Sequence, residues 1–336
     1  MAVKKALCNY SGEIKEVATG DTLSNIAPAG STTQVQYNNA SALAGASNVT
    51  IDSNDITLLA NASPSAPSSG YKLISQSIAT KSTLVGVRNN TIIEPVQTQL
   101  SRRKIGWWNP AGNNTTIPGQ NGVSAPTFVG TATQRDVATT NYFTRIKRVG
   151  YVSTATAGSL TSARTTVAQY TIGDGSGIGG FYFCMVFGCS DAATVSGARQ
   201  FVGLSSTTGA PTNVDPGTLT NCLGVGHSNA DTNLYIYYGG SAAQTRIDLA
   251  SNFPANTLST DMYELILFAD AYGSTVGYQV TRLNTGHVAS GTLSGTVGTA
   301  LPATTTLLNQ WCWRTNNATA LAVGLDYSYY YFEQLH

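Results

Sequence analysis

The sequence predicts an all-β protein, in which an extended N-terminal β-hairpin region precedes a C-terminal antiparallel sandwich or jelly roll. Short apolar runs recur along most of the 336 residues, and turn-forming Gly, Asn and Ser separate them. Asp, Glu, Lys and Arg make up only 10% of the chain, against about 25% in an average soluble protein. No long segment has helical periodicity, and the chain is poor in the Glu, Lys and Arg that favour helices.

Residues 1–60 have the pattern of a string of short hairpins. Ser11 and Gly12 form a turn pair between two strand-like runs, and residues 52–55 separate Val49–Ile51 from Ile56–Leu58 in the same way. The apolar residues of this segment are mostly single Val, Ile, Leu and Ala, which are too few to close a core. We therefore expect the segment to bury its apolar side chains against other copies of the chain or against a larger body.

Residues 61–140 are expected to form a linker and a thin β-rich shaft. Two prolines among small polar residues make 61–70 an extended linker. Two strand-like runs follow it, at Thr83–Arg88 and Ile92–Val96. The adjacent Trp107 and Trp108 would point to opposite faces of a strand. The Gly-, Asn- and Pro-rich stretch that follows is predicted to be a long loop, either functional or held by a partner chain.

Residues 141–336 are expected to form the C-terminal domain, because strand-like runs with turns between them are most frequent there. The runs are Val167–Ile172, Phe181–Phe187, Gln200–Leu204, Cys222–Val225, Leu234–Tyr238, Met262–Ala269, Val276–Val280, Leu307–Trp313 and Leu321–Phe332. Phe181–Phe187 is apolar at every position, so we expect both faces of this strand to be covered, by the opposite sheet and by a loop or neighbouring chain.

Composition argues against several classes of partner. A net charge of +1 and only small basic clusters do not favour nucleic acid. The five cysteines are scattered without a CxxC pair, and the three histidines are dispersed, so neither a metal nor another cofactor is expected. The N-terminus lacks the apolar stretch of a signal peptide, and no apolar run approaches the ~18 residues of a membrane span. We expect a soluble chain made in a cytosol, without membrane insertion.

Catalysis is not expected. The glycine-rich residues 173–180 precede a strand instead of a helix and lack the Lys of a phosphate-binding loop, so they are predicted to be an inter-strand loop. No nucleophile elbow is present. A polysaccharide depolymerase would need two nearby carboxylates, and turn caps or subunit contacts are the alternative roles of the candidates. These candidates are Asp174, Asp191, Asp231, Asp261, Glu264 and Asp270.

Two parts of the chain resemble bacteriophage fibre and tail proteins. The N-terminal resemblance lies in Gly12-Glu13-Ile14, Gly20–Leu23, Thr33–Ala40 and Leu43–Gly45. The C-terminal part is similar to the jelly-roll, concanavalin-like tip domain of such fibres, through Arg199–Leu204, Met262–Leu265, Leu301-Pro302, Leu325–Tyr327 and Tyr330–Glu333. Residues 71–140 lie outside the resemblance.

The resemblance implies a homotrimeric virion appendage, a tail fibre or short spike that is mounted on other phage structural proteins by its N-terminus. A capsid head fibre or decoration protein is the alternative, because both use the same parts. Virion attachment would involve the N-terminal residues Tyr10, Ile14, Leu23, Val35 and Tyr37.

The C-terminal domain would then bind a host-surface glycan or protein. Tyr and Trp offer a flat apolar face to a sugar ring and a polar atom to its hydroxyls, although a core or interface role is the alternative for each of them. Asn- and Thr-rich loops near Ser228–Thr232 and Thr315–Thr319 are the preferred contacts, since binding concentrates on loops over rigid scaffolds. The candidate receptor-binding residues are Asn229, Asp231, Tyr235, Tyr237, Trp313, Asn316 and Asn317.

Overall fold

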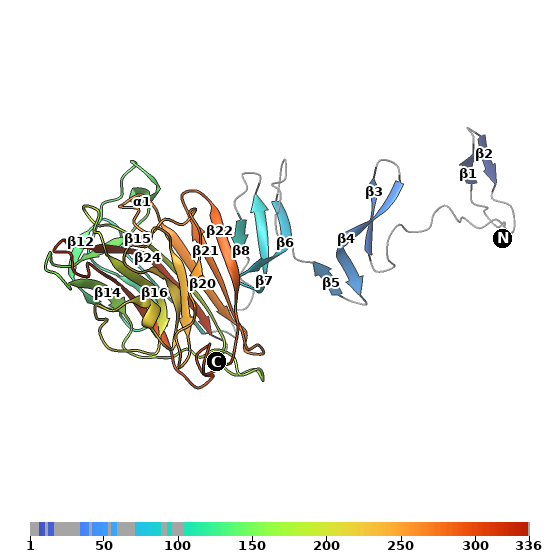
Figure 1. Ribbon diagram of the computed structural model, residues 1–336. Coiled ribbons are helices and arrows are strands. Elements are labelled where there is room, and N and C mark those ends of the chain that lie inside the picture. Colours follow the sequence, from blue (N-terminus) through green and yellow to red (C-terminus); the bar gives the residue numbers. More distant parts are fainter. Residues whose placement is uncertain are drawn as a thin grey trace. The chain divides into compact units, whose positions relative to one another are not determined.

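The computed structural model describes residues 7–10, 13–16, 34–39, 42–52, 55–58, 71–88, 93–95 and 104–334 (Figure 1). The chain divides into two compact units. The first comprises residues 1–76 and 84–94, and the second comprises residues 77–83 and 95–336. We call the second the sandwich unit.

The N-terminal strands form small separate antiparallel sheets, as the sequence predicts. One has two strands, β1 (Leu7–Tyr10) and β2 (Glu13–Glu16), and another has three, β3 (Gln34–Asn39), β4 (Ala42–Asp52) and β5 (Asp55–Leu58). Tyr10 pairs with Glu13 and Asp52 with Asp55, so both predicted hairpins are confirmed. Burial of this segment against other copies stays a prediction.

A further three-stranded sheet contains β6 (Tyr71–Ile78), β7 (Lys81–Arg88) and β8 (Ile93–Pro95). The turn between β6 and β7 was not expected from the sequence. Ala79 and Thr80 both have positive φ, at 47° and 68°, although Gly and Asn are the residues that favour such turns. Residues 77–83, which include this turn, belong to the sandwich unit.

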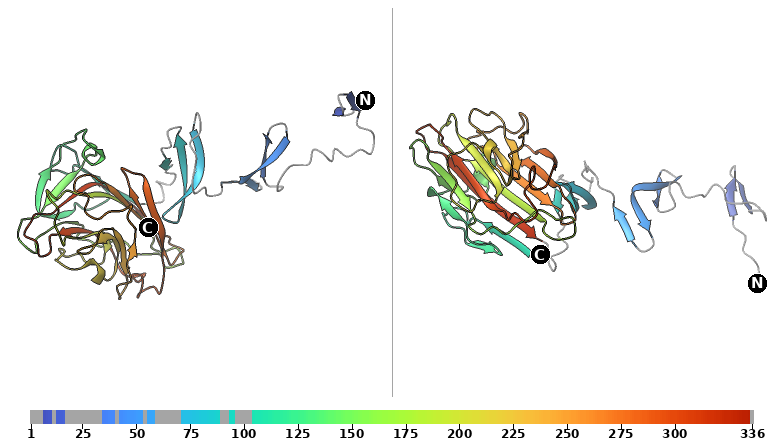
Figure 2. Two further views of the ribbon diagram at one scale, coloured as in Figure 1. Left: turned by 45° about the horizontal axis from the view of Figure 1, so that its top comes forward. Right: turned by 60° about the horizontal axis from the view of Figure 1, so that its bottom comes forward.

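The sandwich unit contains two antiparallel sheets of nine and seven strands (Figures 1 and 2). The nine-stranded sheet consists of β9 (Lys104–Asn109), β10 (Gly119–Asn121), β12 (Thr131–Gln134), β13 (Val149–Val152), β15 (Phe181–Cys189), β20 (Tyr263–Ala269), β21 (Val276–Arg282), β22 (His287–Leu293) and β24 (Gly324–Gln334). The seven-stranded sheet consists of β11 (Thr127–Val129), β14 (Leu160–Arg164), β16 (Arg199–Ser205), β17 (Cys222–His227), β18 (Tyr235–Gly239), β19 (Ile247–Asp248) and β23 (Asn309–Thr315). The predicted all-β class and antiparallel sandwich are confirmed.

The two sheets enclose one continuous apolar core. Phe183, Met185 and Phe187 of β15 belong to the same buried cluster as Val202 and Leu204 of β16. The outer face of β15 is covered as well: Ala79 packs with Cys184, and Phe143 packs with Val186. The prediction that this strand is covered on both faces is therefore confirmed, and residues of the same chain supply the cover.

The sandwich begins earlier than the predicted boundary at residue 141. Strand β9 pairs with β24, with Trp108 opposite Tyr330, and β10, β11 and β12 also join the two sheets. Trp108 is fully buried in the core whereas Trp107 is half-buried, as alternation along a strand requires. Strands β10, β11 and β12 have only three or four residues each, which hides them in the sequence.

Residues Val167–Ile172, which the sequence predicts to be a strand, do not form one. Tyr170 alone makes an isolated bridge, to Leu308. Its side chain is nevertheless buried, and its hydroxyl lies 2.6 Å from that of Tyr330. The apolar run therefore reflects packing into the core without strand pairing.

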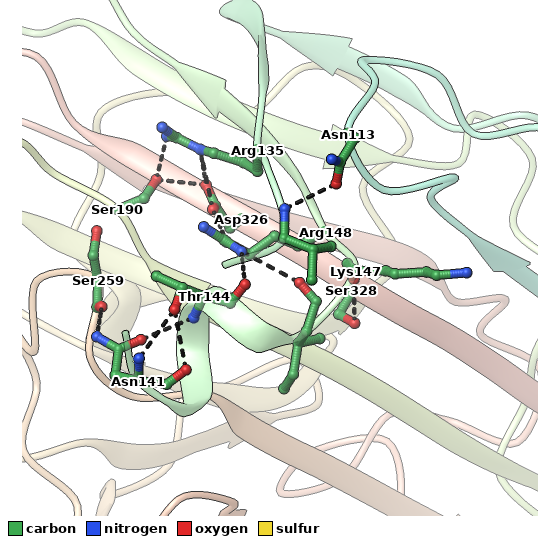
Figure 3. A network of polar contacts seen from close by, with 12 residues as sticks. Asn113, Arg135, Asn141, Thr144, Lys147, Arg148, Ser190, Ser259, Asp326 and Ser328 are labelled. Atoms are coloured by element: carbon green, nitrogen blue, oxygen red, sulfur yellow. Dashed lines mark hydrogen bonds and ion pairs between the residues drawn. The ribbon is translucent and has the colours of Figure 1, made fainter. Parts of the chain in front are cut away.

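A buried polar network fixes the first half of β24 (Figure 3). Asp326 is fully buried, and it accepts hydrogen bonds from Arg135 (3.2 Å), Arg148 (3.0 Å) and Ser190. Arg148 also donates to the backbone carbonyls of Thr144, in the short helix α1 (Tyr142–Arg145), and of Ile146. None of the helices in the described ranges is long and apolar enough to cross a bilayer.

Candidate functional site

Three loops of the sandwich unit leave the same end of the seven-stranded sheet. In the sheet, Gln200 pairs with both His227 and Arg314, so the start of β16 lies between the ends of β17 and β23. The segments before β16, after β17 and after β23, which are residues 190–198, 228–234 and 316–323, therefore emerge together. We call them the end loops.

Beneath the end loops lies a buried network centred on Arg314. The guanidinium is fully buried and forms an ion pair with the equally buried Asp191. It also donates to Gln200 (3.3 Å), His227 (2.8 Å) and Asn256 (2.9 Å). All of its five N–H groups thus have acceptors, which is what an arginine needs to be stable at zero exposure.

His227 is neutral in this network. Its Nε2 accepts from Arg314, so its Nδ1 carries the proton and donates to the carbonyl of Ser228 at 3.0 Å. Burial and the positive charge of Arg314 lower the pKa of His227 to about 3. The ring therefore holds the first residue of loop 228–234 without carrying a charge.

The hydrogen bonds of Asp231 hold the tip of loop 228–234 in place. Its carboxylate accepts from the backbone N–H of Ser228 (2.7 Å) and from both terminal nitrogens of Arg246. Burial lowers the pKa of Arg246, but the bonds to Asp231 raise it, and the net shift is upward. Arg246 is thus a fixed positive charge that neutralises Asp231 beside the loop.

Arg246 also organises the tyrosines of β18. Its Cζ lies 4.0 Å from the ring centroid of Tyr235, and its Nη1 donates to the hydroxyl of Tyr237 at 3.0 Å. Tyr235 is half-buried, whereas Tyr237 is only 2% exposed. Tyr235 is therefore more accessible at the surface than Tyr237.

The loop after β23 is held by its two asparagines. Asn316 is fully buried and donates to the carbonyls of Thr156 and Leu321, both at 2.8 Å. Asn317 has a positive φ of 52°, and its side-chain carbonyl accepts from Asn213 at 3.4 Å. Asn316 thus fixes the loop, and Asn317 stands at its surface.

The end loops converge around Gly197. A Cβ placed on this glycine would lie 3.7 Å from Nδ2 of Asn317 and 3.9 Å from Cβ of Asn229. Asn229 is exposed and Asn317 is half-exposed. Within the described part of the chain, the Nδ2 group of neither residue donates a hydrogen bond to protein. The two asparagines thus lie close to Gly197 on neighbouring end loops, with amide groups that have no protein acceptor among the described residues.

The structure separates the seven predicted receptor-binding residues into two groups. Asn229, Asp231, Tyr235 and Asn317 are at least partly exposed at or beside the end loops. Tyr237, Trp313 and Asn316 are buried, and this corrects their expected role: they support the loops and sheet from within. Tyr237 and Trp313 are buried because the outer face of the seven-stranded sheet is covered, since Val214 and Leu219 pack on its aromatic residues.

Sequence reasoning missed Gly197, Asn213 and Arg246. None of them has a motif, and only the fold brings them to Asn229, Asp231 and Asn317. Of the predicted virion-attachment residues, Tyr10, Ile14, Val35 and Tyr37 lie in β1, β2 and β3. Leu23 lies outside the described residues.

The six candidate carboxylates have partners within the sandwich unit. Asp191 and Asp231 pair with arginines as above, and Asp261 pairs with Arg282 at 2.8 Å. Asp174 and Asp270 accept backbone N–H groups within their own turns. Glu264 accepts from the Cys184 thiol at 3.7 Å, and burial raises its pKa. Among the residues with described side chains, no group of three or more His, Cys, Asp or Glu is placed to hold a metal ion.

No family model and no curated protein matches this chain. Solved structures with a similar fold include peanut lectin, which is 14% identical, with a TM-score of 0.43 over 70% of this chain and 98% of the lectin. Lectin UEA-II in complex with galactose is also 14% identical, with a TM-score of 0.43 over 68% and 98%. A protein of unknown function from Shewanella oneidensis is 12% identical, with a TM-score of 0.42 over 71% and 90%. At such low identity, the function has to be argued from the residues of this chain.

Proposed function

We propose that the end loops bind a glycan on a host cell surface. The observation that carries this proposal is that Asn229 and Asn317 both lie close to Gly197, and that their amide groups have no acceptor in the described protein. Sugar hydroxyls are suitable acceptors for such amides. The half-buried Tyr235 adds an aromatic ring beside loop 228–234. Because Arg246 neutralises Asp231, the site favours hydrogen bonding over ion pairing.

The buried polar network beneath the end loops supports this role. Specific recognition requires polar groups that stay in place before the ligand arrives. Arg314, Asp191 and His227 hold the roots of the end loops through buried hydrogen bonds, and Asn316 holds the loop after β23. The amides are thus presented on a rigid scaffold.

The protein would act as a binding component of a bacteriophage virion, a tail fibre or short spike attached through its N-terminal hairpins. The resemblance of that segment to phage fibre proteins supports this proposal, as does its shortage of core-forming residues. Each site would be weak, and several copies on one particle would add effective concentration. A binding role without catalysis is supported by the carboxylates, which are engaged in ion pairs, turn caps and a thiol contact.

We expect the full chain to be a homotrimer in solution. Light scattering should then give a mass of about three times that of the 35.1 kDa chain. A monomer that persists across the accessible concentration range would remove the basis for the trimeric appendage.

Removing the two amides should weaken glycan binding by at least about tenfold, because each loses hydrogen bonds made only with ligand. The double variant Asn229→Ala with Asn317→Gly is suitable, since glycine keeps the positive φ of residue 317. Binding of the fluorescently labelled full chain to purified host-surface polysaccharide, measured by titration, would report the change.

Gln120→Ala is the matched control, because it removes an exposed side-chain amide from β10 in the other sheet. It should bind as the unmodified protein does. Equal binding by the double variant would refute the end-loop site. Release of reducing ends from the polysaccharide would instead identify a depolymerase.

A further inference from the structure

The sandwich unit contains a cavity of about 460 Å³ on the nine-stranded sheet, away from the end loops. It lies where β15 begins and β24 finishes, next to Tyr182 and Glu333. Since Phe181 pairs with Gln334 and Cys189 with Leu325, this is the opposite end of both strands from Asp191. The volume falls within the ~300–1,000 Å³ of small-molecule sites.

One wall of the cavity is the turn between β6 and β7. Its Ala79 is 2% exposed and packs against Cys184 and Ile266. The close approach depends on Gly277, because a Cβ there would lie only 1.9 Å from the carbonyl oxygen of Ala79. The positive φ values of Ala79 and Thr80 are maintained by this packing. The wall is thus packed against the nine-stranded sheet.

The same wall carries a positive charge. Lys81 Nζ lies 4.7 Å from the ring centroid of Tyr182 and 3.4 Å from Glu333 Oε2. Asp270 is a second acid of the lining, so the lining contains one lysine and two carboxylates. With these three groups ionised, the lining has a net charge of −1, which disfavours an anionic ligand.

The lining combines aromatic rings with hydroxyl and carboxylate groups. Tyr182, Phe268 and Tyr272 supply the rings, and Thr80 and Ser82 supply hydroxyls. Tyr272 is 72% exposed, and a Cβ on Gly177 would lie 2.8 Å from its hydroxyl oxygen, so the ring stands against the glycine-rich loop. An exposed aromatic ring beside hydrogen-bonding groups suits a pyranose, which has an apolar face and polar edges.

We propose that this cavity is a second saccharide-binding site, which takes one or two neutral pyranose units. Its occupant would stack on Tyr272 and bond to the hydroxyls and carboxylates of the wall. The site is independent of the end loops, since it is built from the opposite end of the sandwich and from residues 80–82. A surface polysaccharide could thus be held at two places on one chain.

Saturation-transfer NMR on the full chain tests the proposal, with methyl β-D-galactopyranoside and methyl β-D-glucopyranoside as probes. At least one probe should bind in the millimolar range. Tyr272→Ala should weaken that binding at least about tenfold. Tyr142→Ala, which removes another exposed tyrosine, should not change it. Methyl β-D-glucuronide should bind more weakly than its neutral counterpart.

A second variant tests whether the position of the turn at residues 79–80 is needed for binding. Gly277→Val should displace the turn of residues 79–80 and abolish the signal, while Gly209→Ala, where a Cβ meets nothing within 4 Å, should leave it intact. The double variant of Asn229 and Asn317 should retain the signal. If neither neutral probe binds, or if binding survives Tyr272→Ala and Gly277→Val, the cavity is not a saccharide site, and the end-loop proposal is unaffected.

Discussion

Replacing Asp191 with asparagine should lower the free energy of unfolding of the sandwich unit by about 3 to 5 kcal/mol. The substitution keeps the shape of the side chain but removes the charge that faces Arg314, and both residues have zero exposed side-chain area. The arginine would be left as a buried charge without a counter-ion. Asp191 also accepts the backbone N–H of Gly324 at 2.8 Å, so the start of β24 would weaken too.

Tryptophan fluorescence in a urea titration is the appropriate measurement for this variant. The four tryptophans, Trp107, Trp108, Trp311 and Trp313, all belong to the sandwich unit, so their emission reports on that unit alone. Asp136→Asn is the control, because Asp136 is exposed and its carboxylate accepts a hydrogen bond from the exposed Gln134. An Asp191→Asn midpoint within the range of the control would show that the ion pair contributes little.

The architecture was predictable because its central strands are long and apolar. Phe181–Phe187, Met262–Ala269 and Val276–Val280 each appear in the structure as a strand of the nine-stranded sheet. The turn at residues 79–80 was not predictable, since its positive φ values depend on packing against Gly277, almost two hundred residues further along the chain. Tertiary contacts override local preference there.

The candidate site was predictable in its location and less so in its members. Asn- and Asp-containing turns between apolar runs marked the loops at 228–232 and 315–319, and the structure brings both to the same end of the sheet. Alternation could place Trp313 on one face of β23, but not show that residues 206–221 fold over that face. The pairing of Asp191 with Arg314 joins residues 123 positions apart, and only the sheet register brings them together.

This arrangement has a consequence for the end loops. The side chains of Asn229 and Asn317 are at least partly exposed, whereas the residues that anchor their loops belong to one buried cluster of charged and polar groups. A change in that cluster should therefore reach Asn229 through Ser228, and Asn317 through Thr315, whose hydroxyl accepts from the Asn317 backbone N–H at 3.1 Å. Binding and stability should accordingly respond together to protonation of the cluster.

Acidification from about pH 6.5 to pH 3 should destabilise the sandwich unit through His227. Its pKa is about 3 in the folded protein, against an ordinary value of 6.5. The unfolded state thus binds more protons in this window, so the free energy of unfolding falls as the pH is lowered. The difference corresponds to about 4 to 5 kcal/mol at most. Arg314 faces the ring directly, and Asp191 lies on the far side of that guanidinium.

The contribution of His227 can be isolated by comparing the pH dependence of His227→Gln with that of the unmodified protein, using tryptophan emission in urea at each pH. Glutamine can accept from Arg314 but does not titrate, so this variant should lose less stability between pH 6.5 and 3. Carboxylates such as Glu264 titrate in both proteins and cancel in the comparison. His287→Gln, which changes an exposed histidine, should follow the unmodified protein. Parallel curves for His227→Gln and the unmodified protein would mean that the buried ring does not control acid stability.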